Sequence, residues 1–218
     1  MFAYPRQTEF NRPVPKTKIY AHARASKRLK ELFVAQVGEI VWKYKLSPET
    51  VNLPARNGIS EIQVFELTLK TPELDDAVLA LLDKAIPFPL LFQLVHDGQI
   101  RFAAAYKRPS EADASKWVVE ARFQTDPQPV NAERPPLPVA LDLAGLYEQL
   151  VRRHIALPPR AGEGIMALVT RFNAIAAKRQ ARQKLETRLA QEKQFNRKVE
   201  LNAELRSLTR ELDALTKS

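Results

Sequence analysis

Four residues in the first third of the chain could support the chemistry of a metal-dependent nuclease. Some nucleases hold Mg²⁺ between a strand-end carboxylate and an acid-any-lysine motif on the next strand, where the lysine polarises the phosphate. The candidates here are Glu39, Glu61, Glu66 and Lys70. The spacing departs from that motif, because Thr68 stands two residues before Lys70. We therefore keep a cryptic nuclease as an alternative, assign no catalytic residue and favour a protein that is not an enzyme.

A second set of side chains could contact a polyanion. Lysines and arginines neutralise phosphates, and aromatic rings among them can stack on bases. The candidates, on a predicted helix and a predicted strand, are Arg24, Lys27, Arg28, Lys30, Lys43 and Lys45. Trp42 and Tyr44 alternate with the last two lysines, which predicts that both rings face the other side of the strand and enter the core.

The chain offers little that could hold a metal or a cofactor. It contains no cysteine, so thiolate ligands, disulfides and a cysteine nucleophile are excluded. Its three histidines, His22, His96 and His154, are not at metal-ligand spacing. The six glycines form no phosphate-binding loop followed by lysine and a hydroxyl residue. We expect no cofactor and no metal site.

The charge is distributed unevenly along the chain. There are 34 lysines and arginines against 25 acidic residues, a net charge of +9. Residues 1–30 hold +7 and residues 171–218 hold +6, whereas residues 31–135 hold −4. The basic excess thus lies at the two ends, on either side of a mildly acidic middle, and suggests an acidic partner.

Hydrophobic periodicity predicts the elements that must position these side chains. Helical spacing follows Ser26 up to Gly38, and again follows Thr71 up to Ala85. The predicted strands are residues 39–46, 61–70, 90–95, 100–106 and 117–123. Asp97-Gly98 is a two-residue hairpin signal. The order of elements predicts an α+β fold, a mostly antiparallel sheet with flanking helices.

The expected organisation has five parts. They are an extended basic arm (1–20), an α+β domain (21–125), a proline-rich linker (126–140), a short helix (141–159) and a long basic helix (160–218). Neither glycine nor proline follows Gly164, so the last helix could be continuous. Its final third has leucines with the four-three spacing of a coiled coil: Leu201, Leu205, Leu208, Leu212 and Leu215. We expect them to contact a partner helix.

Four segments together resemble a bacterial family known as domain of unknown function 4391. They are residues 40–50 (IVWKYKLSPET), 61–65 (EIQVF), 82–87 (LDKAIP) and 105–109 (AYKRP). Their order and spacing carry the resemblance, which extends over about residues 10–218. It implies a cytoplasmic prokaryotic protein, often encoded beside helicases and DNA methyltransferases of restriction-like or phage-defence loci. It implies no catalytic residue.

These observations lead to one expected function and two alternatives. We expect a non-enzymatic accessory subunit of a DNA-processing or restriction-like defence system, whose C-terminal helix binds a helicase, a methyltransferase subunit or a second copy of itself. Electrostatic contact with DNA would add to that role. The alternatives are the cryptic nuclease and a homodimeric structural protein with no nucleic-acid role. The longest apolar stretch, residues 86–95, is too short to span a membrane, so we expect no membrane contact and a cytoplasmic location.

Overall fold

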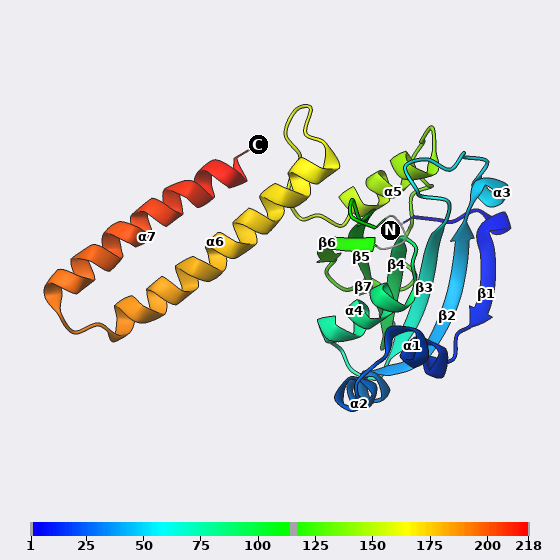
Figure 1. The fold of residues 1–218 in the computed structure, drawn as a ribbon, viewed down its shortest axis with the longest axis horizontal. Coiled ribbons are helices and arrows are strands. Elements are labelled where there is room, and N and C mark those ends of the chain that lie inside the picture. The colour runs from blue at the N-terminus through cyan, green and yellow to red at the C-terminus, as the bar shows by residue number, and fades with distance from the viewer. Residues whose placement is uncertain (1, 114–116, 218) are drawn as a thin grey trace. The chain divides into compact units, whose positions relative to one another are not determined.

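The computed structural model describes residues 2–113 and 117–217. The chain divides into two compact units, Met1–His154 and Ile155–Ser218. The first is built on a β-sheet, and we call it the sheet domain (Figure 1). The second contains two long helices, and we call it the helical hairpin.

Within the described residues, seven strands form one sheet in the order β1-β2-β3-β4-β5-β6, with β7 paired to β5. They are β1 (Glu9–Pro13), β2 (Val37–Leu46), β3 (Ile62–Leu69), β4 (Leu90–His96), β5 (Gln99–Pro109), β6 (Trp117–Gln124) and β7 (Gln128–Pro129). The pair β3–β4 is parallel, because helix α4 (Asp76–Ala85) lies between them in the chain, and the other neighbours are antiparallel. The predicted α+β class with a mostly antiparallel sheet is confirmed.

One face of this sheet packs against helices α1 (Lys16–Ala23), α2 (Lys27–Gln36) and α4. Trp42, Phe65, Phe92 and Ala103 occupy successive register positions across four strands on this face. α4 begins at Asp76 rather than near Thr71, because the Asp75 carboxylate accepts a 2.8 Å hydrogen bond from the Ala77 N–H and caps the helix. The α4 side chains Val78 and Leu82 are fully buried in the same core.

The other face is covered by α5 (Leu143–Arg152), through Tyr147. The Tyr147 ring stacks on Tyr106, and its hydroxyl donates to the Ala105 carbonyl (2.5 Å) and accepts from the Lys107 N–H (2.8 Å). The β4–β5 register ends at Ala104, so these two groups of β5 lack a partner on β4. Tyr147 satisfies buried backbone groups at the point where the neighbouring strand has not yet begun.

The sequence predicted that the first twenty residues form a separate arm, but in the structure they belong to the sheet domain. Residues 9–13 form the edge strand β1, paired antiparallel to β2, and α1 follows. Phe10 packs on Trp42 with 4.2 Å between ring centroids, and Ile19 is buried in the helix-side core. Pro13 is compatible with this strand because an edge position needs no second hydrogen-bonding side.

Strand β2 differs from its predicted form in two ways. Gly38 does not end a helix: α2 ends at Gln36, and Gly38 lies within β2, where a Cβ would be 3.1 Å from the Thr68 carbonyl oxygen of β3. The register also shifts between Trp42 and Tyr44. Trp42 therefore pairs with Phe65 and Tyr44 with Val64, so the two rings lie on opposite faces of the sheet. The prediction that they share one face is wrong.

The proline-rich linker at 126–140 does not separate two domains. Its residues 128–129 form β7, and the Ala3 N–H donates to the Pro135 carbonyl at 2.7 Å. The chain divides instead after His154, so the sheet domain includes α5. A short helix, α3 (Pro48–Val51), and the 3₁₀ turn η1 (Arg6–Thr8) complete this unit.

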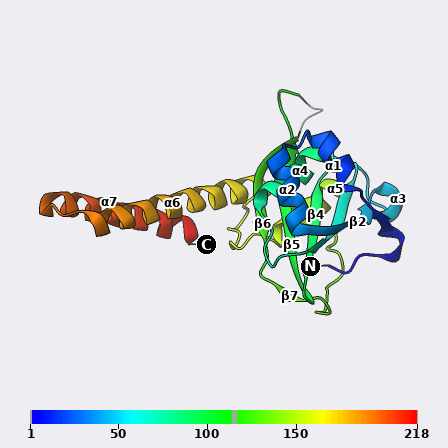
Figure 2. The same ribbon diagram turned by 90° about the horizontal axis from the view of Figure 1, so that it is seen from below.

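The C-terminal segment is not one helix but two antiparallel ones, α6 (Ile165–Gln191) and α7 (Phe195–Thr216). They lie side by side in both views (Figures 1 and 2). The break falls at 192–194, where a Glu192 carboxylate oxygen accepts hydrogen bonds from the Lys193 and Gln194 N–H groups.

The leucines predicted to meet a partner helix pack inside this hairpin. Leu201 and Leu212 are buried, and Leu205, Leu208 and Leu215 are half-buried. Pairing of Lys178 with Glu211 joins the two helices, and Arg171 of α6 donates to the Leu215 carbonyl of α7 at 3.0 Å. The helix beside these leucines is α6 of the same chain, and a coiled coil with a partner helix stays a prediction.

Candidate anion-binding groove

A hollow in the sheet domain lies on the helix-covered face, beside the edge strand. It has a volume of about 640 Å³. Its walls are β1 and α1 on one side and residues 84–88, at the end of α4 and just after it, on the other, and strands β2 and β3 form its floor. We call it the groove.

Aromatic rings form much of the floor. Trp42 lies 4.2 Å from Phe10 and 5.9 Å from Phe65 between ring centroids, and Phe88 comes from the loop before β4. The Trp42 Nε1–H donates to the Tyr44 carbonyl at 3.0 Å, which fixes the indole. The sequence placed Trp42 in the core, and the structure places it half-buried, with part of its surface on the groove.

The rim of the groove is basic. Arg12 of β1, Lys18 and His22 of α1, and Lys84 of α4 are exposed and line it. The Arg12 guanidinium carbon lies 4.3 Å from the centroid of Phe10. No described carboxylate comes within 4 Å of Arg12, Lys18 or Lys84, so their charges are not neutralised by the parts of the chain that the structure describes. A hollow with rings below and free cations above can hold an anionic ligand that has a flat apolar part.

Lys107 positions one wall of the groove from inside the domain. Its side chain is 0% exposed, and its Nζ lies 2.8 Å from Asp83 Oδ1, while the Arg122 Nε–H donates to Asp83 Oδ2 at 2.9 Å. The same Nζ donates to the carbonyl oxygens of Ile86 (3.4 Å) and Phe88 (3.1 Å). Burial lowers the pKa of the Lys107 ammonium, and the Asp83 carboxylate opposes that shift. Lys107 is a positioning residue, since it holds the backbone that carries Phe88.

The six basic residues predicted from the sequence fall into two groups. Arg24, Lys27, Arg28 and Lys30 are exposed where α1 meets α2, beside a smaller hollow that shares Lys84 with the groove. Lys43 and Lys45 are instead each 3.1 Å from a carboxylate, of Glu66 and Glu61 respectively. Of the first group, Arg24 lines that smaller hollow and Lys27 lies 4.0 Å from the Glu31 carboxylate, while the second group is neutralised.

The structure does not bring the predicted nuclease residues together. Glu61 contacts Lys45 and the Gln63 side chain, whereas Glu66, three residues beyond Gln63, lies on the opposite face of β3. Glu39 is exposed on β2, and the Lys70 Nζ donates to the Val34 carbonyl at 2.8 Å. In residues 2–113 and 117–217 there is no group of three histidine or acidic side chains that could hold a metal ion.

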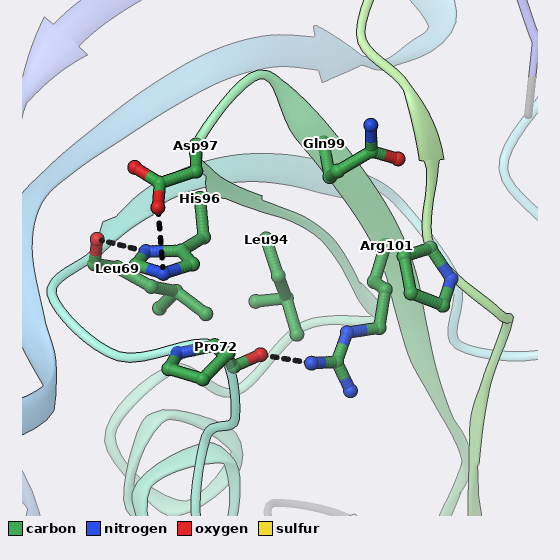
Figure 3. Close-up of a pocket in the computed structure, with 8 residues that line it drawn as sticks. Leu69, Pro72, Leu94, His96, Asp97, Gln99 and Arg101 are labelled. Atoms are coloured by element: carbon green, nitrogen blue, oxygen red, sulfur yellow. Dashed lines mark hydrogen bonds and ion pairs between the residues drawn. The ribbon is translucent and has the colours of Figure 1, made fainter.

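A small cavity of about 150 Å³ beside α4 contains an Asp–His pair (Figure 3). His96 Nδ1 lies 3.2 Å from the Leu69 carbonyl, and Nε2 lies 3.5 Å from Asp97 Oδ2. The Arg101 guanidinium donates to the Pro72 carbonyl. Both imidazole nitrogens are thus occupied, and none of the lining residues has a hydroxyl nucleophile. The pair stabilises a turn rather than forming a catalytic dyad.

The sequence missed the residues that define the groove. Arg12 and Lys18 lie in what was predicted as an extended basic arm, His22 lies just beyond it, and Lys84 was not among the predicted basic candidates. The +7 charge of residues 1–30 was the available signal. Nothing in the sequence indicated that β1 pairs with β2, and this pairing brings the charge beside Trp42.

An α+β sheet domain with a basic-rimmed groove, joined to a helical hairpin, is the class of protein that these features define. The chain belongs to the family described as domain of unknown function DUF4391, whose model matches residues 2–212. Comparison with curated proteins and with solved structures found no match. None of the helices in the described part of the chain is long and apolar enough to cross a membrane.

Proposed function

We propose that this protein is a non-enzymatic accessory subunit that binds single-stranded nucleic acid in the groove. The observation that carries the proposal is the combination of aromatic floor and unneutralised rim, formed by Trp42 and Phe10 below Arg12, Lys18 and Lys84. Stacking of a base on an aromatic side chain contributes about 1–3 kcal/mol, and cations beside it contact the backbone phosphates.

The shape of the site favours a single strand over a duplex. Readers of B-DNA insert a helix or a two-stranded ribbon into the major groove, so they present a convex element. Here the aromatic rings lie at the bottom of a hollow, and only an unpaired base offers them its face. The groove is open to any sequence, because stacking and phosphate contact do not depend on base identity.

Trp42 gives a direct readout of this proposal. The chain has two tryptophans, so Trp117→Phe leaves Trp42 as the sole indole, and it lines the groove. Titration with a short oligothymidylate should quench its fluorescence. Arg12→Ala should weaken the binding about tenfold, a loss of about 1.4 kcal/mol. Arg6→Ala is the matched control, since Arg6 is also exposed and near the N-terminus but does not line the groove.

Equal affinities for the Arg12→Ala and Arg6→Ala variants would place the binding outside the groove and refute this proposal. The same samples incubated with Mg²⁺ should contain intact oligonucleotide. Cleavage that is abolished by Glu61→Ala would support the nuclease alternative instead.

The proposed wider role is in a DNA-processing or restriction-like defence assembly, and it is supported by the family resemblance. Isolation of the protein from its host, with and without residues 160–218, should recover a helicase or methyltransferase subunit only with the full chain. Equal recovery from both would assign the partner contact to the sheet domain.

A further inference from the structure

The tip of the helical hairpin exposes two large apolar side chains. Phe195 is 77% exposed and Val199 is 50% exposed, and they stand one turn apart at the start of α7. Side chains four residues apart share one face of a helix, so they form one apolar patch. We call this patch, with the basic residues around it, the tip.

Basic side chains surround this patch. Lys193 and Lys198 stand two and three residues from Phe195, Arg188 lines a hollow beside the turn, and no described carboxylate comes within 4 Å of any of the three. Two carboxylates lie in the same segment, Glu192 and Glu200. Glu192 accepts the Lys193 and Gln194 N–H groups, and Glu200 lies 3.5 Å from Arg197. A hollow of about 450 Å³ lies beside the turn, between Arg188 and Leu201.

The size of the patch limits what could cover it. A stable protein interface buries about 800 Å² on each partner, usually over 20–30 residues. Two side chains cannot supply such an interface by themselves. A single aromatic ring is enough to stack on one base, and the neighbouring cations can contact the adjacent phosphates. Both the charge and the size of the tip therefore favour nucleic acid.

The single exposed ring of the tip identifies which base it would meet. Among the residues that the structure describes, no ring contacts the Phe195 ring, so Phe195 can cover one face of a base only. Such a single free face occurs at the end of a base-pair stack. We propose that the tip stacks Phe195 on the terminal base pair where a duplex meets a single strand, with Lys193 and Lys198 on the flanking phosphates. This inference rests on the proposed function for the kind of ligand, but it uses different residues in the other unit.

The test uses a DNA duplex with a single-stranded overhang and 2-aminopurine in the terminal base pair. The full-length protein should change the 2-aminopurine fluorescence on binding. Phe195→Ala should abolish that change and weaken affinity for this DNA about fivefold to a hundredfold, the loss of one stacked base. Its affinity for the overhang strand alone should stay unchanged. Leu141→Ala is the matched control, since Leu141 is 87% exposed but lies outside the hairpin.

Three outcomes separate this inference from the proposed function. If Phe195→Ala retains the 2-aminopurine signal and the affinity of the unaltered protein, the tip does not stack on the junction and this inference is wrong. Binding of the overhang strand, sensitive to Arg12→Ala, would in that case leave the groove proposal intact. If the unaltered protein binds neither DNA, both are wrong. Phe195→Trp should keep the ring and restore junction binding, which excludes misfolding as the cause of the loss.

Discussion

One ion pair in the sheet domain and one in the helical hairpin differ in their exposure to water, although the hairpin also holds a buried pair between Arg171 and Glu163. In the sheet domain Lys107 and Asp83 are 0% and 2% exposed, and the pair holds the end of α4 and the loop beside the groove. In the hairpin Lys178 and Glu211, which join α6 to α7, are 32% and 50% exposed. Water can replace either partner of the exposed pair, but it cannot reach the buried one.

The apolar core of the sheet domain is also more extensive than that of the hairpin. The sheet domain buries side chains on both faces of the sheet, against α1, α2 and α4 on one side and α5 on the other. The hairpin buries one stripe between two helices, and much of its surface is charged. We infer that the sheet domain is the rigid unit that positions a ligand site, and that the hairpin is the less stable unit.

The largest expected effect comes from removing one partner of the buried ion pair. Asp83→Ala leaves Lys107 and Arg122 without their carboxylate partner, and Lys107 in the interior of the sheet domain. Loss of one partner of a buried pair lowers the free energy of unfolding by about 3–5 kcal/mol. Both tryptophans lie in the sheet domain, so their fluorescence in a urea titration follows this unit specifically.

Glu211→Gln in the hairpin is the matched variant. It removes a carboxylate from an exposed pair, so it should lower the free energy of unfolding by less than about 1 kcal/mol. Equal losses for the two variants would contradict the contrast between a buried and an exposed ion pair.

The next effect in size is a pH dependence from His154, the last residue of the sheet domain. Burial lowers its pKa to about 4, from an ordinary value of 6.5, and its Nδ1 lies 2.7 Å from the Leu150 carbonyl. Below pH 6.5 the imidazole of His154 binds a proton in the unfolded chain, whereas in the folded chain it stays neutral down to about pH 4. The contribution of neutral His154 to the free energy of unfolding is therefore fully present above pH 6.5. It falls by about 3 kcal/mol as the pH drops to about 4.

Urea titrations at pH 7.5 and 4.5 measure this difference. His154→Gln should remove most of the pH dependence in this range, whereas His22→Gln, at an exposed position, should leave it in place. If both variants keep the full dependence, other groups cause it.

A smaller loss is expected in the hairpin core. Leu212 is buried between α7 and α6. Leu212→Ala should lower the free energy of unfolding of the hairpin by about 2 kcal/mol. This is near the low end for leucine-to-alanine changes in a core, because the two helices can close partly over the cavity that is left. The thermal unfolding transition of the hairpin, followed by circular dichroism at 222 nm, should shift to lower temperature. The tryptophan transition should not move, and a common shift would show that the two units unfold as one.

Much of the sheet was predictable from local patterns. Strand β3 and the hairpin around Asp97-Gly98 followed from alternation and from the turn residues, whose φ angles of +45° and +71° fit the two-residue turn that was predicted. Residues 9–13 were not recognised as a strand, because Phe10 is the single large apolar side chain among them. An edge strand gains its pairing from β2, and the local sequence carries little trace of it.

The hairpin and the groove required long-range information. The break at Glu192 has neither glycine nor proline, and its only trace in the sequence was a shift in the leucine register. The groove combines residues from β1, α1, β2 and the segment at and after the end of α4, which are up to 78 positions apart between Phe10 and Phe88. Composition showed that the N-terminal segment is basic, but only the fold shows that this basic segment lies beside Trp42.

The central claim is that the rim of the groove contacts the phosphates of a single strand. The direct test is the salt dependence of oligothymidylate binding by the unaltered protein and by the triple variant Arg12→Ala, Lys18→Ala, Lys84→Ala. Each lost phosphate contact lowers the slope of log K against log salt by about 0.7 for single strands. The account predicts that the triple variant binds more weakly and that its slope falls by about 2. An unchanged slope and affinity would contradict it.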